Sequence, residues 1–205
     1  MADGPGWTLE RRLWARGAVA VAGVDEAGRG ALAGPVAAAV VVLQAGRDYP
    51  YRDSKTLVRE QRARLAERLR SEAVAYAVEF ATAVEVDSLN VLGATKAAAR
   101  RAVERVRHSL DALVTDYLPL GCGVPEVAEA RADAISYQVA AASILAKHER
   151  DTYLARLEDE YPGYGFAKHV GYGVPEHLDA LRRLGPCSEH RLSFAPVAAV
   201  NLFGA

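Results

Sequence analysis

Cysteines and long apolar segments are both scarce in this chain. Its 205 residues include only Cys122 and Cys187, so a disulfide framework is not expected and a reducing compartment, the cytoplasm, is. No uncharged apolar run reaches the roughly 18 residues that a membrane-spanning helix needs, so no membrane association is expected. The first residues mix arginines, acidic residues and tryptophans, which differs from the basic and then apolar layout of a secretory signal.

Lysine is also rare, and the net charge of −1 shows no excess of either sign. A balanced average neither supports nor opposes a nucleic-acid partner, because phosphate binding needs only a local basic patch. The lysines are Lys55, Lys96, Lys147 and Lys168, whereas arginines are abundant. All except Lys96 fall within the motifs described below. This clustering favours placement for a function, with surface solubility as the alternative.

Apolar periodicity divides the chain into strands and helices. Short or alternating apolar runs predict strands at 19–24, 36–43, 74–83 and 111–115. Longer runs with helical spacing predict helices at 56–72, 87–108, 134–160 and 176–184. The first two strands follow each other as in a β-ribbon, and later strands alternate with helices. We therefore expect an α/β fold with a mixed sheet.

No repeat, low-complexity segment or linker divides this pattern. We expect an N-terminal extension at 1–18 and a single domain at 19–205, with a C-terminal helical part from about residue 162. Pro162 and Gly163 end the longest predicted helix, and Pro175 suits the first turn of the next one.

Four carboxylates stand where predicted strands end or a predicted helix begins. Asp25 and Glu26 end the first strand. Asp116 ends the strand at 111–115, and Asp133 opens the longest helix. Crowded carboxylates repel one another unless a cation binds, so their convergence at one sheet edge would make a metal site. Oxygen ligands without cysteines or suitably spaced histidines favour Mg²⁺ or Mn²⁺.

Simpler roles remain open for two of the aspartates. Asp133 and Asp87 both stand where an aspartate caps a helix, and capping is the commoner role of such a residue. Asp25 and Glu26 are harder to explain by stability, because the pair leads from a buried strand directly into glycines.

The segment Gly28–Arg29–Gly30 follows this acidic pair. Glycine lets a backbone approach a ligand closely, and Arg29 can bind a phosphate. A dinucleotide-binding turn is the rival interpretation and would make the chain an oxidoreductase. The spacing up to Gly34 opposes it, since it is one residue too long, and a valine-rich strand follows where a helix is required.

Six motifs follow one another along the chain. They are DEAGRGALAGPV at 25–36, DSK at 53–55, VDSLN at 86–90, AAASILAK at 140–147, YGFAKHVGYG at 164–173 and RLSFAPV at 191–197. This set resembles the type 2 ribonuclease H family, specifically bacterial ribonuclease HII, over residues 22–197. The resemblance implies a ribonuclease H-like mixed β-sheet flanked by helices, with a small C-terminal helical extension.

The resemblance also implies an endonuclease that cuts the RNA strand of RNA–DNA hybrids and single ribonucleotides within duplex DNA. Asp25, Glu26, Asp116 and Asp133 match the family's metal-binding catalytic carboxylates. Two divalent ions roughly 4 Å apart would activate water and stabilise the leaving 3′-oxygen, giving a 3′-hydroxyl and a 5′-phosphate. A hybrid-binding module without chemistry is the alternative, which the intact carboxylates oppose.

Four residues match positions that read the sugar. Gly28, Arg29 and Gly30 match the turn whose backbone recognises the ribose 2′-hydroxyl at the RNA–DNA junction. Tyr172 matches the tyrosine that packs against the deoxynucleotide sugar on the 3′ side of that junction.

Lys55, Ser143 and Lys147 match segments that face the phosphates. Lys147 lies 14 residues after Asp133, so a continuous helix would project both side chains from nearly one face. Among the histidines, His169 is the one whose motif position makes it a candidate for touching the substrate.

Two residues depart from the family pattern. Val170 stands where lysine is usual, and Val174 where threonine is usual, which bears on the phosphate contacts of this loop. At the end of the chain, Asn201–Ala205 faintly resembles a sliding-clamp-binding peptide, which makes a sliding clamp a candidate partner. We otherwise expect a monomer whose partners are RNA–DNA hybrids and DNA duplexes containing ribonucleotides.

Overall fold

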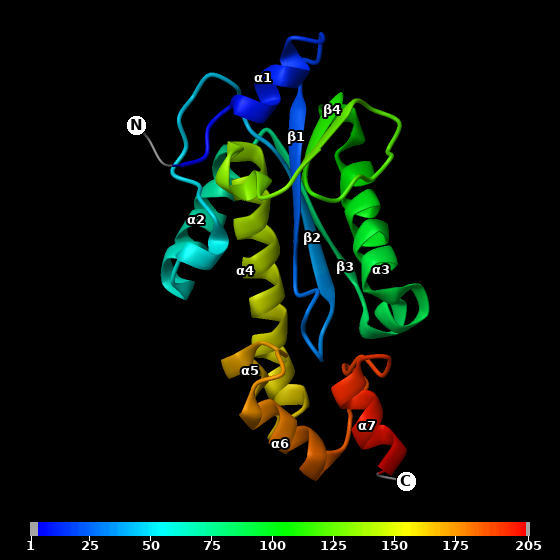
Figure 1. The fold of residues 1–205 in the computed structure, drawn as a ribbon. Helices are drawn as coiled ribbons and strands as arrows, with labels where there is room; N and C mark the ends of the chain where they lie inside the picture. Colours follow the sequence, from blue (N-terminus) through cyan, green and yellow to red (C-terminus); the bar gives the residue numbers. More distant parts are fainter. Residues whose placement is uncertain (1–3, 204–205) are drawn as a thin grey trace.

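A five-stranded mixed sheet forms the centre of the molecule (Figure 1). The computed structural model describes the backbone of residues 4–203 and the side chains of residues 4–200. The strands are β1 (Val21–Ala27), β2 (Val36–Val42), β3 (Ala75–Ala81), β4 (Ala112–Asp116) and β5 (Glu126–Glu129), in the spatial order β3-β2-β1-β4-β5. β1 pairs antiparallel with β2 and parallel with β4, which confirms the predicted mixed sheet and its first ribbon.

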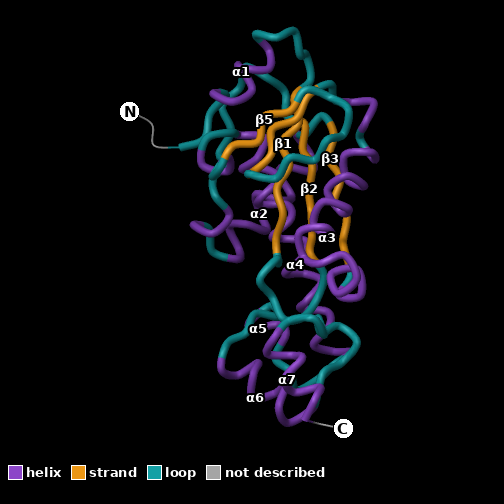
Figure 2. The backbone as a smooth tube through the Cα atoms, turned by 45° about the vertical axis from the view of Figure 1, so that its right-hand side comes forward, coloured by secondary structure: helices purple, strands orange, loops and turns teal. Residues whose placement is uncertain are grey.

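Helices cover both faces of this sheet. They are α1 (Thr8–Trp14), α2 (Arg59–Glu72), α3 (Ala83–Arg105), α4 (Tyr137–Glu160), α5 (Phe166–His169), α6 (Pro175–Leu184) and α7 (Ala195–Phe203), with 3₁₀ turns η1 (Ser54–Thr56), η2 (Arg107–Ser109) and η3 (Ala132–Ala134). α3 packs on one face, and α4, backed by α2, packs on the other (Figures 1 and 2). In β2, Val40 faces α3 and Val41 faces α4, so the strand is buried at every position.

Small residues let α4 lie close against the sheet. Residues 140–142 are three buried alanines, and a Cβ placed on Gly23 would lie 2.2 Å from the carbonyl carbon of Gln138. The Gln138 side chain also bridges two strands, because its Nε2 donates to the Val21 carbonyl (2.7 Å) and its Oε1 accepts the Leu43 N–H (2.8 Å). These contacts fix α4 across β1 and β2.

The predicted cap at Asp87 is wrong. α3 begins after Thr82, whose hydroxyl accepts the N–H of Glu85 (3.2 Å), and Asp87 lies inside the helix. The Asp87 carboxylate instead accepts the N–H groups of Leu192 and Ser193, each at 2.9 Å. It therefore ties the C-terminal segment to α3.

A capping role at Asp133 is also wrong. Asp133 lies in η3, and α4 is capped by Ser136, whose hydroxyl accepts the N–H of Val139 (3.1 Å). Arg131, directly before η3, has the left-handed φ of 60° that turns the chain into η3. Asp133 is therefore separated from α4 by a turn and does not begin the helix.

Periodicity missed the short elements α1, α5, α7 and β5. α1 buries Leu9 and Leu13 against β1 and β4, so part of the expected N-terminal extension belongs to the core. α5, α6 and α7 gather beyond one end of the sheet, where the C-terminal helical part was expected (Figure 2). α6 begins at Pro175 as predicted.

The end of the chain and its helices bear on two further expectations. Side chains from residue 201 onward lie outside the described residues, and so does the suggested clamp-binding peptide Asn201–Ala205. Within residues 4–203, no helix has both the length and the apolar character that crossing a bilayer requires.

Candidate active site

Three aspartates meet at one edge of the sheet. Asp25 lies on β1 and Asp116 ends β4, and the parallel register places Val24 beside Thr115, so the two aspartates are neighbours. η3 adds Asp133, and one carboxylate oxygen from each aspartate lies within 4.8 Å of the other two. The Ala132 N–H donates to Asp116 (3.1 Å), which links the two chain segments. The predicted convergence of these three residues is therefore what the structure shows.

Burial and like-charge repulsion act together at this edge. Burial first, and then the neighbouring Glu26 and Asp116, raise the pKa of Asp25 well above its usual range. Burial, followed by the charges of Asp53 and Asp116, also raises the pKa of Asp133. A divalent cation would relieve this repulsion, and the donor set consists of oxygens alone, which suits Mg²⁺ or Mn²⁺.

Glu26 is the fourth predicted carboxylate, and it is held differently. Its Oε1 accepts a hydrogen bond from the Arg29 guanidinium at 3.1 Å. Burial raises the pKa of Glu26, Arg29 opposes that shift, and Asp116 adds to it. Arg29 is thus occupied by a carboxylate in this structure, although the sequence suggested that it binds phosphate.

The substrate residues named from the sequence line one cavity of about 250 Å³. Its wall contains Asp25, Glu26, Ala27, Gly28, Arg29, Gly30, Ser54, Lys55, Asp116, Ser143, Lys147 and Tyr172. Asp133 lies at its edge, 3.8 Å from the Lys55 ammonium. A larger cavity of about 830 Å³ lies beside α1, but it contains none of the predicted site residues. Apart from Asp133, all the site residues predicted from the sequence therefore line the smaller cavity.

η1 and α4 bring two of the phosphate-facing candidates together. Asp53 caps η1 by accepting the Lys55 N–H (2.9 Å), and this turn carries Ser54 and Lys55 to the cavity. The Ser54 hydroxyl lies 2.9 Å from that of Ser143 on α4. Ser143 is therefore engaged within the protein, whereas the Lys55 side chain is largely exposed to solvent.

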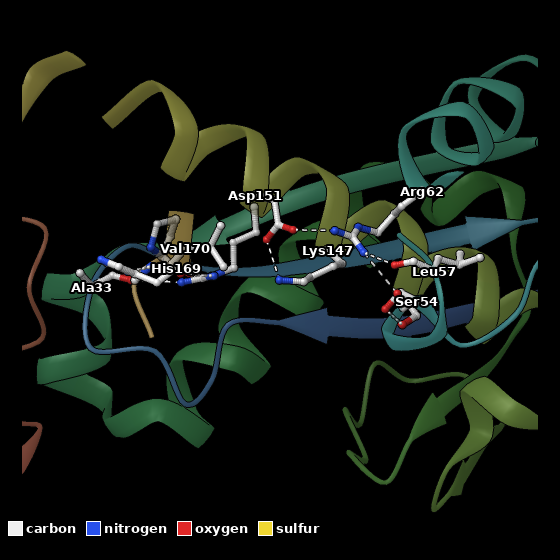
Figure 3. Close-up of polar contacts among 12 residues, drawn as sticks. Ala33, Ser54, Leu57, Arg62, Lys147, Asp151, His169 and Val170 are labelled. Atoms are coloured by element: carbon white, nitrogen blue, oxygen red, sulfur yellow. Dashed lines mark hydrogen bonds and ion pairs between the residues drawn. The ribbon is translucent and has the colours of Figure 1, made fainter. Parts of the chain in front are cut away.

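Lys147 is oriented by two buried residues that the sequence did not single out. Its ammonium lies 2.7 Å from the Asp151 carboxylate, which also accepts a hydrogen bond from Arg62 at 2.9 Å. Figure 3 shows Asp151 between the two cations. The predicted alignment of Lys147 with Asp133 along one helix does not hold, because Asp133 precedes α4.

Two buried arginines, Arg150 and Arg191, hydrogen-bond to the glycine turn and to the residues that follow it up to Pro35. Arg150 donates to the carbonyls of Pro35, Ala33 and Val170 at 2.9–3.1 Å. A Cβ on Gly28, whose φ is +92°, would lie 1.8 Å from the Arg150 Nε. Only glycine therefore leaves room for this guanidinium under the turn.

Arg191 supports the same turn from its other side. Its guanidinium donates to the carbonyls of Gly34 (2.8 and 3.0 Å) and Arg29 (2.9 Å). Neither buried arginine was expected from the sequence, although Arg191 begins one of the motifs. A buried cation that is satisfied by backbone carbonyls is a role that residue type alone does not reveal.

Tyr172 also lines the cavity. Its ring centre lies 5.6 Å from the Lys147 ammonium and 5.5 Å from the Arg150 guanidinium, within cation–π range. Gly171 packs against the glycine turn so closely that a Cβ on it would lie 2.3 Å from the Ala33 carbonyl oxygen. The loop that carries Gly171 and Tyr172 (the tyrosine loop) thus packs directly against the segment that follows Gly30.

His169, the histidine considered for substrate contact, uses both ring nitrogens within the protein. Nε2 lies 2.8 Å from the Tyr164 carbonyl, and Nδ1 accepts the Gly171 N–H at 3.2 Å. Val174 is the N-cap residue of α6 and makes no side-chain cap. The usual threonine at that position would therefore cap a helix, which is a local structural role.

The motifs and the fold agree with comparisons to known proteins. The family model for ribonuclease HII matches residues 22–197. The chain is 54% identical to a ribonuclease HII of Thermus thermophilus, over 98% of this chain and 97% of the relative. It is 47% identical to ribonuclease HII of Desulfitobacterium hafniense, over 92% of this chain and 73% of that relative.

Solved structures extend the similarity to the fold. The ribonuclease H2 from Pyrococcus horikoshii OT3 aligns with a TM-score of 0.78 and 26% identity, covering 90% of this chain and 98% of that one. The structure of the PCNA:RNase HII complex from Archaeoglobus fulgidus aligns with a TM-score of 0.74 and 24% identity, covering 88% and 96%. The chain belongs to the ribonuclease HII family.

Proposed function

We propose that this ribonuclease HII cuts duplex DNA at a single embedded ribonucleotide, on the 5′ side of that residue. Metal-dependent endonucleolytic hydrolysis of RNA in RNA–DNA hybrids is the activity of its family. One observation carries the finer proposal: a single cavity contains the glycine turn and three of the four acidic residues, with Asp133 at its edge. The sugar that the turn recognises would thus lie beside the bond that is cut.

Asp25, Glu26, Asp116 and Asp133 would hold two divalent ions, Mg²⁺ or Mn²⁺. Bound ions would supply an activated water and charge stabilisation for the leaving oxygen. The fit rests on the clustered oxygens of the aspartates and on the repulsion that raises the pKa of Asp25. Breaking the Glu26–Arg29 pair would free the carboxylate for an ion and the guanidinium for a phosphate.

Backbone groups of the glycine turn would recognise the 2′-hydroxyl. Telling ribose from deoxyribose requires hydrogen-bonding groups aimed at that hydroxyl. Gly28 is glycine because of the guanidinium beneath it, but Gly30 is exposed, and a Cβ added to it would meet no atom within 4 Å. Packing does not require glycine at that position. Close approach of a substrate sugar would.

Tyr172, Lys147 and Lys55 would place the strand on either side of the cut. The Tyr172 ring would pack on the sugar 3′ of the ribonucleotide, where a 2′-hydroxyl would be disfavoured. Lys147 retains an attraction for phosphate because the Asp151 carboxylate is shared with Arg62, which leaves this group of three with one net positive charge. Cleavage with the 3′-oxygen as the leaving group gives a 3′-hydroxyl and a 5′-phosphate.

Cleavage of an end-labelled DNA duplex with one ribonucleotide tests the proposal. We expect a single Mg²⁺- or Mn²⁺-dependent cut 5′ of the ribonucleotide, which excess chelator abolishes. Asp25→Asn should abolish cleavage and retain duplex binding, while Asp159→Asn, an exposed carboxylate far from the cavity, should leave both unchanged. Cleavage in excess chelator would refute the metal mechanism, and binding without cleavage by the native chain would make it a binding module.

Gly30→Ala tests the turn separately from stability. Because the added methyl meets no protein atom, the free energy of unfolding should change little. Cleavage of the single-ribonucleotide duplex and of a continuous RNA–DNA hybrid should nevertheless fall by on the order of tenfold or more, because the added methyl displaces the substrate sugar. Normal cleavage by a Gly30→Ala enzyme would remove the turn from substrate recognition.

Tyr172→Ala tests the reading of the junction. We expect it to lose much of its activity on a single embedded ribonucleotide and less on a continuous RNA–DNA hybrid. Steady-state rates on the two substrates give the ratio that matters. Equal losses would show that Tyr172 supports the site in general and does not read the junction.

The proposed partners are RNA–DNA hybrids and ribonucleotide-containing duplexes, bound by a monomer. The Archaeoglobus fulgidus relative is described as a complex with PCNA, so a sliding clamp is a further proposed partner through Asn201–Ala205. Light scattering of the purified chain measures its mass in solution. Loss of clamp binding on deletion of residues 201–205 would support that contact, and unchanged binding would rule it out.

A further inference from the structure

Three histidines and a cysteine cluster behind Tyr172, where the reaction does not use them. His169 lies on α5, His177 on α6, and Cys187 and His190 lie in the segment between α6 and α7. His177 and His190 are buried, and the His169 ring stacks on that of His177 with centroids 4.4 Å apart. The sequence alone indicated no role for these residues beyond the candidate contact of His169.

The hydrogen bonds of this cluster determine where each proton lies. The Cys187 N–H donates to His190 Nδ1 at 3.0 Å, and the Cys187 thiol lies 3.2 Å from the same nitrogen. His190 Nδ1 is therefore unprotonated, and a neutral His190 carries its proton on Nε2. That nitrogen lies 3.1 Å from His177 Nε2 and donates to it.

The relay continues from His177 to Tyr172. Since His177 Nε2 accepts, the neutral His177 ring carries its proton on Nδ1, which lies 2.9 Å from the Tyr172 carbonyl oxygen. Each donor in the series Cys187, His190, His177 thus meets an acceptor, and Tyr172 ends it. A proton added to either ring would set two N–H groups against each other or set one against the Cys187 N–H.

The groups facing the relay from neighbouring elements leave it without a balancing charge. His169 on α5 is hydrogen-bonded in the same way, with its Nδ1 accepting the Gly171 N–H and its Nε2 facing the Tyr164 carbonyl. The Tyr164 ring tilts against His190 with centroids 5.0 Å apart. No carboxylate in the described residues hydrogen-bonds to His177 or His190, so an imidazolium would be unpaired as well as buried.

The relay ends at the residue whose ring faces the active-site cavity. The Tyr172 carbonyl also accepts the Val174 N–H (2.9 Å), and the Tyr172 N–H donates to the His169 carbonyl (3.0 Å). The ring meanwhile contacts Lys147 and Arg150 on the cavity side. In Figure 3, His169 and Val170, which precede Tyr172 in the chain, lie at the opposite end of the view from Arg62. The backbone of Tyr172 is thus held by hydrogen bonds while its ring lines the cavity.

We propose that His177 and His190 are positioning residues: their relay from Cys187 fixes the Tyr172 carbonyl, and so places the Tyr172 ring, only while both imidazoles are neutral. The inference rests on the proposed role of Tyr172 in reading the sugar 3′ of the ribonucleotide. Acidification should release Tyr172, so preference for a single embedded ribonucleotide should decline before cleavage of a continuous hybrid does.

The environment of the rings agrees with this neutral state. Burial lowers the pKa of His177, and burial together with the neighbouring His177 lowers the pKa of His190 to about 4. Both rings are then neutral at pH 7. The ratio of rates on the two substrates isolates the relay, because both substrates need the same carboxylates and their titration cancels.

Nitrogen NMR of the full chain tests the relay without an activity assay. Long-range ¹H–¹⁵N spectra distinguish the two imidazole tautomers. We expect a proton on Nε2 of His190 and on Nδ1 of His177 at pH 7, with the Tyr172 ring resonances shifting as either histidine titrates in acid. The opposite tautomer at either ring, or a charged ring at pH 7, would overturn the proposal.

Two variants of His177 test the effect on selectivity. In His177→Asn, the amide NH₂ can replace Nδ1–H as donor to the Tyr172 carbonyl, whereas His177→Leu has no donor. We expect His177→Leu to lower the single-ribonucleotide to hybrid ratio by on the order of tenfold, and His177→Asn to retain the ratio and make it insensitive to acid. His108→Asn, an exposed histidine elsewhere, is the matched control.

The outcomes separate this proposal from the function on which it rests. If Tyr172→Ala changes the ratio but a folded His177→Leu does not, the positioning role is refuted while the reading role stands. If Tyr172→Ala leaves the ratio unchanged, the reading role fails, and the positioning role fails with it even where the tautomers are as assigned. If His177→Leu does not fold, His177→Asn and the acid dependence of the native ratio decide.

Discussion

The two sides of the active-site cavity are stabilised in opposite ways. On the sheet side, carboxylates crowd together, and burial with like-charge repulsion raises the pKa of Asp25. On the helical side, Arg150 and Arg191 are buried, and their side-chain hydrogen bonds all go to backbone carbonyls. These acceptors are Val170 and residues between Arg29 and Pro35. The sheet side keeps an excess of negative charge, even though Arg29 pairs with Glu26 and Lys55 lies 3.8 Å from Asp133, whereas the buried arginines of the helical side are satisfied by the chain itself.

This difference indicates a division of work between the two sides. The sheet side keeps unfavourable charge that a metal ion can neutralise, so part of its stability comes from the ligand. The helical side is preorganised by hydrogen bonds and close packing, as the proposed recognition of a sugar requires. Electrostatic repulsion is therefore concentrated at the proposed metal site.

Opposite responses to pH should follow without metal. The pKa of Asp25 is raised in the fold, so the folded state binds the extra proton and stability falls as the pH rises above the usual value of 3.8. The pKa of His190 is lowered, so stability falls as the pH decreases from 6.5 towards about 4. Glu26 and Asp133 share the first dependence, and His177 shares the second. The first should therefore weaken in Asp25→Asn and the second in His190→Gln, as thermal unfolding in chelator can measure.

Gly171→Ala should break the helical side most severely. Gly171 has a φ of +80°, and its new Cβ would lie 2.3 Å from the Ala33 carbonyl. Strain and collision together should lower the free energy of unfolding by about 3 kcal/mol. Gly46→Ala is the matched control, since Gly46 has a φ of +79° with open space around it and should lose about 1 kcal/mol. Equal losses would mean that close packing of the tyrosine loop on the turn is unimportant.

Arg191→Lys should have the next largest effect. Lysine keeps the charge but cannot reach the carbonyls of both Gly34 and Arg29, so at least one buried acceptor loses its partner. We expect a loss of about 2 kcal/mol in urea unfolding, with reduced cleavage because the turn is displaced. Arg105→Lys, at an exposed ion pair with Glu79, should change stability by less than about 0.5 kcal/mol. Native stability and cleavage in Arg191→Lys would show that Arg191 does not hold the glycine turn in place, and would contradict the preorganisation of the helical side.

Asp25→Asn should act in the other direction on the sheet side. Removing one of the crowded charges should raise stability in chelator by on the order of 1 kcal/mol, the repulsion of two charges about 4 Å apart in water. Thermal unfolding with and without Mg²⁺ gives both values, and the stabilisation by Mg²⁺ should shrink in the variant. If Asp25→Asn is less stable than the native chain in chelator, repulsion among the carboxylates does not destabilise the fold. The contrast between the two sides of the cavity then fails.

Val174→Thr should have the smallest effect, a gain. Val174 occupies the N-cap of α6 without a side-chain cap, and threonine would supply an oxygen for a free N–H. We expect about 0.5 kcal/mol of added stability and unchanged cleavage. Val84→Thr, at an exposed position within α3, should bring no gain. A change in substrate affinity would instead indicate that the residue at position 174 takes part in phosphate contacts.

The residues of the proposed active site were readable from the sequence because strand ends and glycine turns are local signals. Asp116 ends β4, and Asp25 lies within β1, which continues two residues beyond Asp25 to Ala27. Because β1 and β4 are parallel neighbours, the meeting of the two aspartates still followed from pattern and topology. Asp133 was right as a member of the cluster and wrong as a helix start, since a 3₁₀ turn gives no periodic signal.

The supporting residues were not readable in this way. Arg150, Arg191 and Asp151 belong to types that abound on surfaces, and nothing local marks them as buried. Each has a partner far away along the chain, at separations of 115, 162 and 89 residues respectively. The same applies to the histidine relay, whose tautomers depend on which groups the fold brings within hydrogen-bonding distance.

By itself, the sequence determined the α/β sheet, the acidic cluster, the glycine turn and the family, because apolar period and short motifs are properties of neighbouring residues. Only the tertiary structure decided that Arg29 pairs with Glu26, that Asp151 orients Lys147, and that buried arginines and neutral histidines support Tyr172 and the turn. Burial is the physical reason, because the charge, tautomer and partner of a polar group are set by surroundings that distant segments create.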